Sequence, residues 1–255
     1  MIKKQVLGTA QLGLDYYGIS NFSKKKNDRD ILSLLHNAYS LGIKYFDTAP
    51  GYKSEKIIGK FIKKHNLKNK VNIITKIPKL KENQNPVNQI FKSIENSLEN
   101  LNLNKLFCVL MHDQNDIKIL KNKKNFIKVL KKKFNIKNFG FSVYDYSAAK
   151  KILHFFPDAS IQFPYNLINN KFDKLKKKKN LFFARSIFCQ GLLTSKNIKF
   201  INPKINYSFK KYSAFIKTNK INPVQLCLDY AYSNKNLNFI VYGTKNIEEL
   251  NQIIN

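Results

Sequence analysis

The stretch "IKYFDTAPGY", residues 43–52, joins a short apolar run to an aspartate, and a tyrosine follows five residues after it. Ile43, Tyr45 and Phe46 are β-branched or aromatic, as strand residues commonly are, and Asp47 closes the run. Acids are scarce in this chain, which has 16 of them against 46 lysines and arginines. The stretch predicts a strand that delivers a carboxylate at its carboxyl end, with the Tyr52 phenol just beyond it.

Seven other short apolar runs follow the same plan. They cover residues 5–10, 71–76, 106–112, 136–142, 160–163, 181–187 and 237–243. Most are followed by segments with apolar residues at helical spacing, such as residues 28–42, 86–101 and 222–233. The last of these begins with Asn222 as an expected N-cap and Pro223 at the first helical position. The alternation predicts a parallel sheet, either open or closed as a (β/α)8 barrel.

Two parts of the chain fit this plan less well. The sixth helical segment, residues 169–179, is weak because it is dominated by lysine and asparagine. Residues 190–220 form a long stretch that the pattern does not divide into elements. No change of composition and no flexible linker interrupts the 255 residues, so we expect one domain over residues 1–255.

Composition narrows the class of protein. No apolar run approaches the roughly 20 residues that span a bilayer. Polar residues and a glycine interrupt the N-terminal segment, which argues against a secretory signal: Gly8, Thr9 and Gln11. Three cysteines lie far apart in apolar segments, without metal-ligand spacing: Cys108, Cys189 and Cys227. We expect reduced core thiols in a cytoplasmic protein without membrane attachment.

The formal net charge of +30 raises the question of nucleic-acid binding. Only two of the 46 basic residues, Arg29 and Arg185, are arginines. Surfaces that read phosphates and bases usually rely on the planar fork of arginine. Lysine, asparagine and isoleucine are abundant together, which favours a codon bias over a binding surface, so no nucleic-acid partner is expected.

Polar residues terminate successive apolar strands. Asp47 ends the second predicted strand, Lys76 the third and His112 the fourth. The later strands end at or near Ser142, Gln162, Arg185 with Ser186, and Gly243 with Thr244. Each of these could alone be the start of a loop, but the carboxyl ends of barrel strands meet at one face, where such enzymes carry their active sites. The set predicts one site.

The residue types at this edge suit proton transfer to a carbonyl oxygen. A free phenol is a weak acid, with a pKa of about 10, and a neighbouring ammonium lowers that pKa. We expect Tyr52 to be the acid, Lys76 its activator and Asp47 the partner that keeps the lysine charged. His112 would orient the substrate oxygen. No protein side chain supplies hydride, so a nicotinamide cofactor is implied.

The segment "FDTAPGYKSEKIIG" resembles the signature of the aldo-keto reductases. Further matching segments follow in order: "IITK", "LMHD", "GFSVY", "IQFPYN", "SIFCQGLL" and "VYGTKNIEEL". The resemblance implies a single-domain (β/α)8 TIM barrel and an NAD(P)-dependent oxidoreductase with the tetrad Asp47, Tyr52, Lys76 and His112. It implies that Ser142 and Gln162 hold the nicotinamide carboxamide and that Gly8 lies under the cofactor. It places the cofactor phosphates at Arg185, Ser186, Gln190, Gly191, Gly243, Thr244 and Lys245.

Three departures from the family pattern bear on this expectation. Val143 stands where many members have an asparagine that contacts the carboxamide. Glu249 stands where NADPH-preferring members carry a base, although Lys245 can partly replace it, so NADP and NAD both stay open. The N-terminal hairpin and the C-terminal loop of longer members have no counterpart before Asn255. A more open pocket follows, one that would admit a sugar-like substrate.

Two classes of function follow from the sequence. The first is a cytoplasmic oxidoreductase that reduces a carbonyl, or oxidises the corresponding alcohol, of a small sugar-like substrate. The second is a non-catalytic barrel protein, cofactor-sensing or associated with nucleic acid, whose positive charge would be its binding surface. The complete tetrad favours the enzyme. Neither the substrate nor the oligomeric state is encoded in a recognisable motif.

Overall fold

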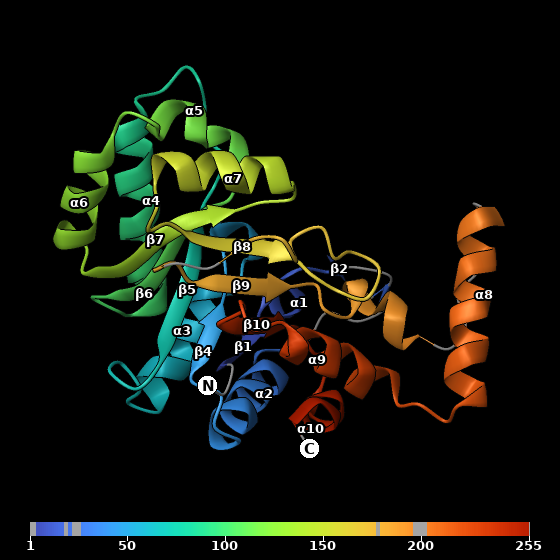
Figure 1. Cartoon of the computed structure of the whole chain (residues 1–255). Coiled ribbons are helices and arrows are strands. Elements are labelled where there is room, and N and C mark those ends of the chain that lie inside the picture. Colours follow the sequence, from blue (N-terminus) through green and yellow to red (C-terminus); the bar gives the residue numbers. More distant parts are fainter. Residues whose placement is uncertain (1–3, 18–19, 22–26, 177–178, 196–202, 255) are drawn as a thin grey trace.

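Each of the eight predicted apolar runs forms a strand in the computed structural model, which describes residues 4–17, 20–21, 27–176, 179–195 and 203–254. The eight strands are parallel and close into a barrel (Figure 1). They are β1 (Lys4–Gly8), β4 (Tyr45–Asp47), β5 (Asn72–Ile77), β6 (Leu106–Met111), β7 (Ile136–Ser142), β8 (Ser160–Pro164), β9 (Phe182–Arg185) and β10 (Phe239–Tyr242). Their order around the barrel is their order in the chain, and β1 closes the ring by pairing with both β10 and β4. The predicted single-domain TIM barrel is confirmed.

Helices and turns connect the strands. The α-helices are α1 (Ala10–Gly13), α2 (Asp28–Ser40), α3 (Glu55–Lys64), α4 (Pro86–Leu101), α5 (Ile117–Leu120), α6 (Lys124–Lys133), α7 (Tyr146–Phe155), α8 (Pro203–Thr218), α9 (Pro223–Ser233) and α10 (Ile247–Ile254). Three 3-10 turns are η1 (Pro50–Tyr52), η2 (Gln114–Asp116) and η3 (Cys189–Thr194). A short antiparallel ribbon, β2 (Tyr16–Tyr17) with β3 (Ser20–Asn21), follows α1.

Asparagine begins several of these helices. The side chain of Asn222 accepts hydrogen bonds from the backbone N–H groups of Val224 and Gln225, as predicted for the start of α9. Asn85 caps α4 in the same way, and each of these two asparagines is followed by a proline at the first helical position. In this asparagine-rich chain the caps fix where the helices after β5 and before β10 begin.

Two apolar clusters hold the barrel together. The larger one lies between the strands and the surrounding helices. The smaller one takes residues from five strands on opposite sides of the ring and therefore fills the barrel interior: Val6, Ile74, Cys108, Leu110, Phe183, Phe239 and Val241. These side chains plug the barrel. The polar residues at the strand ends lie beyond this plug, at the carboxyl edge of the barrel.

The two weakly patterned regions have different outcomes. The described part of residues 169–179 forms turns instead of a sixth helix, although Phe172 and Leu175 are buried. Within residues 190–220 the chain forms η3 and α8, and the Tyr212 hydroxyl of α8 donates to the carbonyl of Leu193 in η3. Residues 196–202 lie outside the described part of the chain. No described helix is long and apolar enough to cross a bilayer.

Candidate active site

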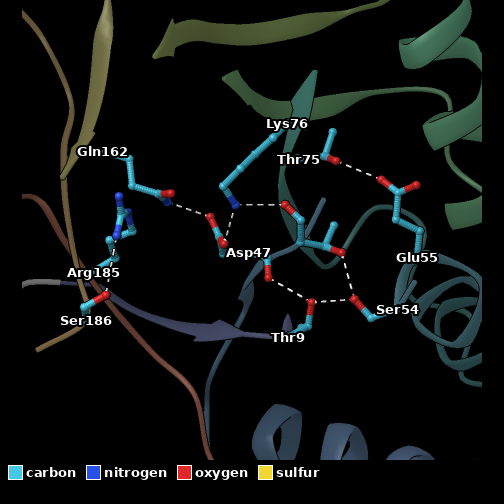
Figure 2. A network of polar contacts seen from close by, with 10 residues as sticks. Thr9, Asp47, Ser54, Glu55, Thr75, Lys76, Gln162, Arg185 and Ser186 are labelled. Carbon is cyan, nitrogen blue, oxygen red and sulfur yellow. Dashed lines mark hydrogen bonds and ion pairs between the residues drawn. The ribbon is translucent and has the colours of Figure 1, made fainter. Parts of the chain in front are cut away.

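Lys76 and Asp47 form a buried ion pair at the carboxyl edge of the barrel (Figure 2). The Lys76 side chain is 1% exposed, and its Nζ donates to Asp47 Oδ1 at 2.6 Å and to the Thr48 carbonyl at 2.9 Å. Burial lowers the pKa of Lys76, but Asp47 and Tyr52 raise it, and the net shift is upward. The lysine is therefore charged at neutral pH, and the aspartate is positioned to balance it.

Tyr52 reaches this pair from η1, five residues after Asp47. The Lys76 Nζ lies 4.9 Å from the centroid of the Tyr52 ring. The position of η1 depends on α1, since a Cβ added to Gly13 would lie 2.0 Å from the Tyr52 carbonyl oxygen. The first loop of the barrel thus sets where the phenol stands.

His112 completes the predicted tetrad after β6. Its ring lies edge-on to that of Tyr52, with centroids 6.0 Å apart and an interplanar angle of 86°. Burial, followed by the charge of Lys76, lowers the pKa of His112 to about 4. The imidazole is therefore uncharged at neutral pH. It can donate one hydrogen bond through its N–H without becoming protonated itself.

A chain of three buried hydroxyls, which the strand-end pattern does not predict, supports the ion pair. Thr9 Oγ1 donates to the carbonyl of Asp47 at 2.9 Å and lies 2.9 Å from Ser54 Oγ, which lies 3.0 Å from Thr48 Oγ1 (Figure 2). Behind it, Thr75 Oγ1 donates to Glu55. Ser54 and Glu55 lie within the quoted signature, so that motif anchors the loop as well as supplying Asp47 and Tyr52.

Gln162 contacts the Asp47 carboxylate. Its Nε2 donates to Asp47 Oδ2 at 2.6 Å, an orientation that follows because an ionised carboxylate can only accept. The side chain is fully buried, and its Oε1 has no hydrogen-bond partner among the described residues. Ser142 lies opposite Gln162 in the register of β7 and β8. The orphaned acceptor marks a place for a donor that the protein itself does not provide.

A cavity of about 310 Å³ opens at this edge. Besides Asp47 and Tyr52, its walls include seven of the predicted cofactor residues: Gly8, Arg185, Ser186, Gln190, Gly191, Gly243 and Lys245. The remaining predicted residues are not among those that line the cavity: Lys76, His112, Ser142, Gln162 and Thr244. Thr244 is buried and its hydroxyl donates to the carbonyl of Asn246, so the side chain serves the start of α10.

Glu249, Gln252 and Gln11 also line the cavity, and sequence reasoning singled out only the first of them. The Glu249 carboxylate accepts from the backbone N–H of Lys245 at 2.7 Å, which holds it at the α10 end of the cavity. Gln11 has a buried Oε1 without a hydrogen-bond partner among the described residues. Gln11 lies two residues after Thr9, and this position is the sequence feature that could have identified it as a residue of the cavity.

The eight strand ends, one cavity and a charged lysine beside a phenol define a barrel enzyme equipped for acid–base chemistry. A sequence model of the aldo/keto reductase family matches residues 5–255. The chain belongs to this family and is an NAD(P)-dependent oxidoreductase.

Solved structures share the fold at low sequence identity. The glycerol dehydrogenase of Gluconobacter oxydans is 20% identical, with a TM-score of 0.75, and the match covers 98% of this chain and 85% of that one. An aldo-keto reductase of Bacillus halodurans, solved in its holo form, is 18% identical, with a TM-score of 0.79 and the same two coverages. No curated protein matches the chain.

Proposed function

We propose that the enzyme reduces the carbonyl group of a small sugar-like substrate, or oxidises the corresponding alcohol, with Tyr52 as the general acid or base. The observation that carries this proposal is the buried Lys76–Asp47 pair beside the Tyr52 ring. A solvent-shielded ammonium next to a phenol favours the phenolate that remains after proton donation. No other described group in the cavity combines a proton donor with such a partner.

The residues present suit a nicotinamide cofactor. The orphaned Gln162 Oε1 can accept from the carboxamide amine, with Ser142 beside it in register. Gly8 can lie under the ring, and Ser186, Gln190, Gly191, Gly243, Lys245 and the backbone of Thr244 can hold the phosphates. When bound, NADPH or NADH supplies the hydride that the carbonyl carbon receives. Glu249 and Lys245 at the far end support neither cofactor exclusively.

The chain's own groups handle the proton. As the carbonyl carbon gains hydride, the π electrons of the C=O bond move to oxygen, and that oxygen takes the proton from Tyr52 Oη. Lys76 stabilises the phenolate left behind, and solvent protonates it again. His112, neutral, donates a hydrogen bond that fixes the carbonyl oxygen. Oxidation of an alcohol runs through the same positions in reverse.

Replacing Tyr52 by phenylalanine tests the mechanism. Because Tyr52→Phe removes the acidic hydroxyl and keeps the ring, kcat should fall about 100- to 10,000-fold while the Kd for NADPH or NADH stays within a few-fold. Steady-state kinetics and cofactor fluorescence measure the two quantities. Turnover at the wild-type rate in this variant would rule out Tyr52 as the proton donor.

The cysteines and the basic residues bear on the cellular location of the enzyme and on its binding partners. We infer a cytoplasmic enzyme with a small-molecule partner and without a nucleic-acid partner, from the reduced thiols and the lysine-dominated charge. Salt-titrated binding to duplex and single-stranded nucleic acid tests the last point: affinity that persists at about 0.15 M salt would contradict it.

A further inference from the structure

Arg185 stands apart from the other cations of the chain. It is one of two arginines among 46 basic residues, and it ends β9 on the wall of the cavity that Tyr52 also lines. The side chain is half-buried instead of extending freely into solvent. A fixed guanidinium can form two parallel hydrogen bonds to an oxyanion, which an ammonium cannot do.

The contacts of Arg185 orient the guanidinium without neutralising it. Its centre lies 4.3 Å from the centroid of the Tyr144 ring, and its nitrogens make long contacts to the Val143 carbonyl (3.4 Å) and to Ser186 Oγ (3.5 Å). In Figure 2 a dashed line joins Arg185 to Ser186 alone. Across the described part of the chain, no carboxylate forms an ion pair with it. Its donors therefore retain capacity for an anion.

The charged groups near Tyr52 and His112 do not neutralise the Arg185 guanidinium. Asp47 and Lys76 neutralise each other at 2.6 Å. The charge of Arg185 is felt at His112, which places the guanidinium near the catalytic histidine. Glu249 lies at the α10 end of the cavity, where the backbone of Lys245 holds it. The charge of Asp113 also acts on His112, but this carboxylate lies 3.9 Å from the Lys79 ammonium and forms no ion pair with Arg185 among the described residues.

The Arg185 side chain extends away from the loop that is expected to hold the cofactor phosphates. The barrel order is β10, β9, β8, β7, and Arg185 reaches from β9 past β8 to residues that follow β7, Val143 and Tyr144. The loop expected to hold phosphates, residues 243–245, follows β10 on the other side of β9. The guanidinium therefore lies away from that loop and towards His112.

We propose that Arg185 binds an anionic group, a carboxylate or a phosphoryl group, carried by the carbonyl substrate. This inference rests on the proposed reductase function and names its substrate class: a small carbonyl compound bearing an oxyanion, as sugar acids and sugar phosphates do. The anion fits between the guanidinium and solvent, with the Tyr144 ring on the far face of the fork. The carbonyl then lies between Tyr52 and His112.

Matched substrate pairs test the proposal. One pair is 4-carboxybenzaldehyde and its neutral methyl ester, and the other is glyceraldehyde 3-phosphate and glyceraldehyde. In Arg185→Met the ratio of kcat/KM for the anionic to the neutral member should fall about 10- to 100-fold, as expected for the loss of charged hydrogen bonds. Arg185→Lys should retain part of the ratio, because charge remains while the fork is lost. The pair that shows the larger loss identifies the anion as carboxylate or phosphoryl.

The control variant is Lys235→Met, which removes one exposed positive charge four residues before β10, at the opposite end of the barrel. This variant should keep the wild-type ratio. An unchanged ratio in Arg185→Met would overturn the proposal. So would a weaker Kd for NADPH or NADH with an unchanged ratio, since Arg185 would then serve the cofactor phosphates.

Product binding separates this inference from the proposed reaction. Calorimetry can compare 4-carboxybenzyl alcohol with its methyl ester as ligands of the enzyme in complex with NADPH or NADH, which cannot accept hydride from an alcohol, so that no turnover occurs. An anion preference that disappears in Arg185→Met supports the binding site even if none of the aldehydes is reduced, in which case the proposed reaction fails. Equal affinities in the wild-type protein would overturn the site while leaving the reaction intact.

Discussion

Lys76 and Asp47 form a buried ion pair that costs desolvation free energy but fixes a charged ammonium beside Tyr52. Moving an ammonium and a carboxylate out of water costs several kcal/mol each, and mutual attraction repays this only with good geometry. Here the ammonium donates to both Asp47 Oδ1 and the Thr48 carbonyl, and Gln162 satisfies the second carboxylate oxygen. The pair is therefore held in one place, beside Tyr52.

The uncharged state of the His112 ring predicts how the stability of the fold depends on pH. Its pKa in the folded protein is about 4, against an ordinary value of 6.5. The unfolded chain therefore binds more protons between these two pH values, so this residue should lower the stability of the fold as pH falls from 6.5 towards 4. In NMR titration its ring resonances should stay constant from pH 8 to about 5.

His112→Gln assigns the His112 resonance. The pH dependence of the unfolding free energy between pH 4 and 6.5 should be weaker in this variant than in the wild-type protein. A titration midpoint near 6.5 for His112 would contradict the burial argument. It would also allow the imidazolium, instead of the neutral ring, to contact substrate.

The gathering of Asp47, Tyr52, Lys76 and His112 was predictable from sequence, because parallel strands end on one edge and a position at a strand end therefore translates into proximity. The hydroxyl chain through Thr9, Ser54 and Thr48 was not, because threonine and serine are common in loops and have no distinctive spacing. The bond from Gln162 to Asp47 joins residues 115 positions apart. Only closure of the barrel brings them together.

At the scale of elements, the strands were easier to predict than the connections. Every apolar run became a strand, since burial on both faces requires nearly continuous apolar sequence. Residues 169–176 behaved differently: Phe172 and Leu175 are buried, but they anchor turns, and two apolar residues three apart do not distinguish a turn from a helix. Lysine-rich neighbours supplied no further pattern.

The contact of α1 with η1 leads to a prediction about loop packing. Gly13→Ala would place a Cβ 2.0 Å from the Tyr52 carbonyl oxygen and within 3 Å of the backbone of residues 53 and 54. Backbone atoms must move to accept it, so η1 and the phenol should shift. We expect kcat/KM to fall about 100-fold, as small displacements of catalytic groups do, with cofactor affinity less affected.

Gly51→Ala is the matched control. It makes the same chemical change within η1 itself, and an added Cβ there meets no heavy atom within 4 Å. This variant should keep most of the wild-type kcat/KM. Equal losses in the two variants would show that flexibility of η1, and not its packing against α1, determines the rate.

At the scale of the whole molecule, charge is the dominant feature. The formal net charge is +30, and only three ion pairs form among the described residues. One of them is the buried Lys76–Asp47 pair, so the surface contributes two. Most lysines among the described residues therefore form no ion pair with an acid, and repulsion between them destabilises the folded state.

Salt should stabilise the protein for this reason. Raising NaCl from about 10 mM to about 0.5 M shortens the screening length from roughly 30 Å to less than 8 Å and weakens repulsion between surface lysines. The melting temperature should rise by several degrees, mostly below about 0.2 M, where screening changes most. Differential scanning calorimetry measures this at constant pH, with an uncharged osmolyte as the control for general exclusion effects. A melting temperature that falls across the same range would mean that attraction between opposite charges outweighs the repulsion between lysines, and it would contradict this prediction.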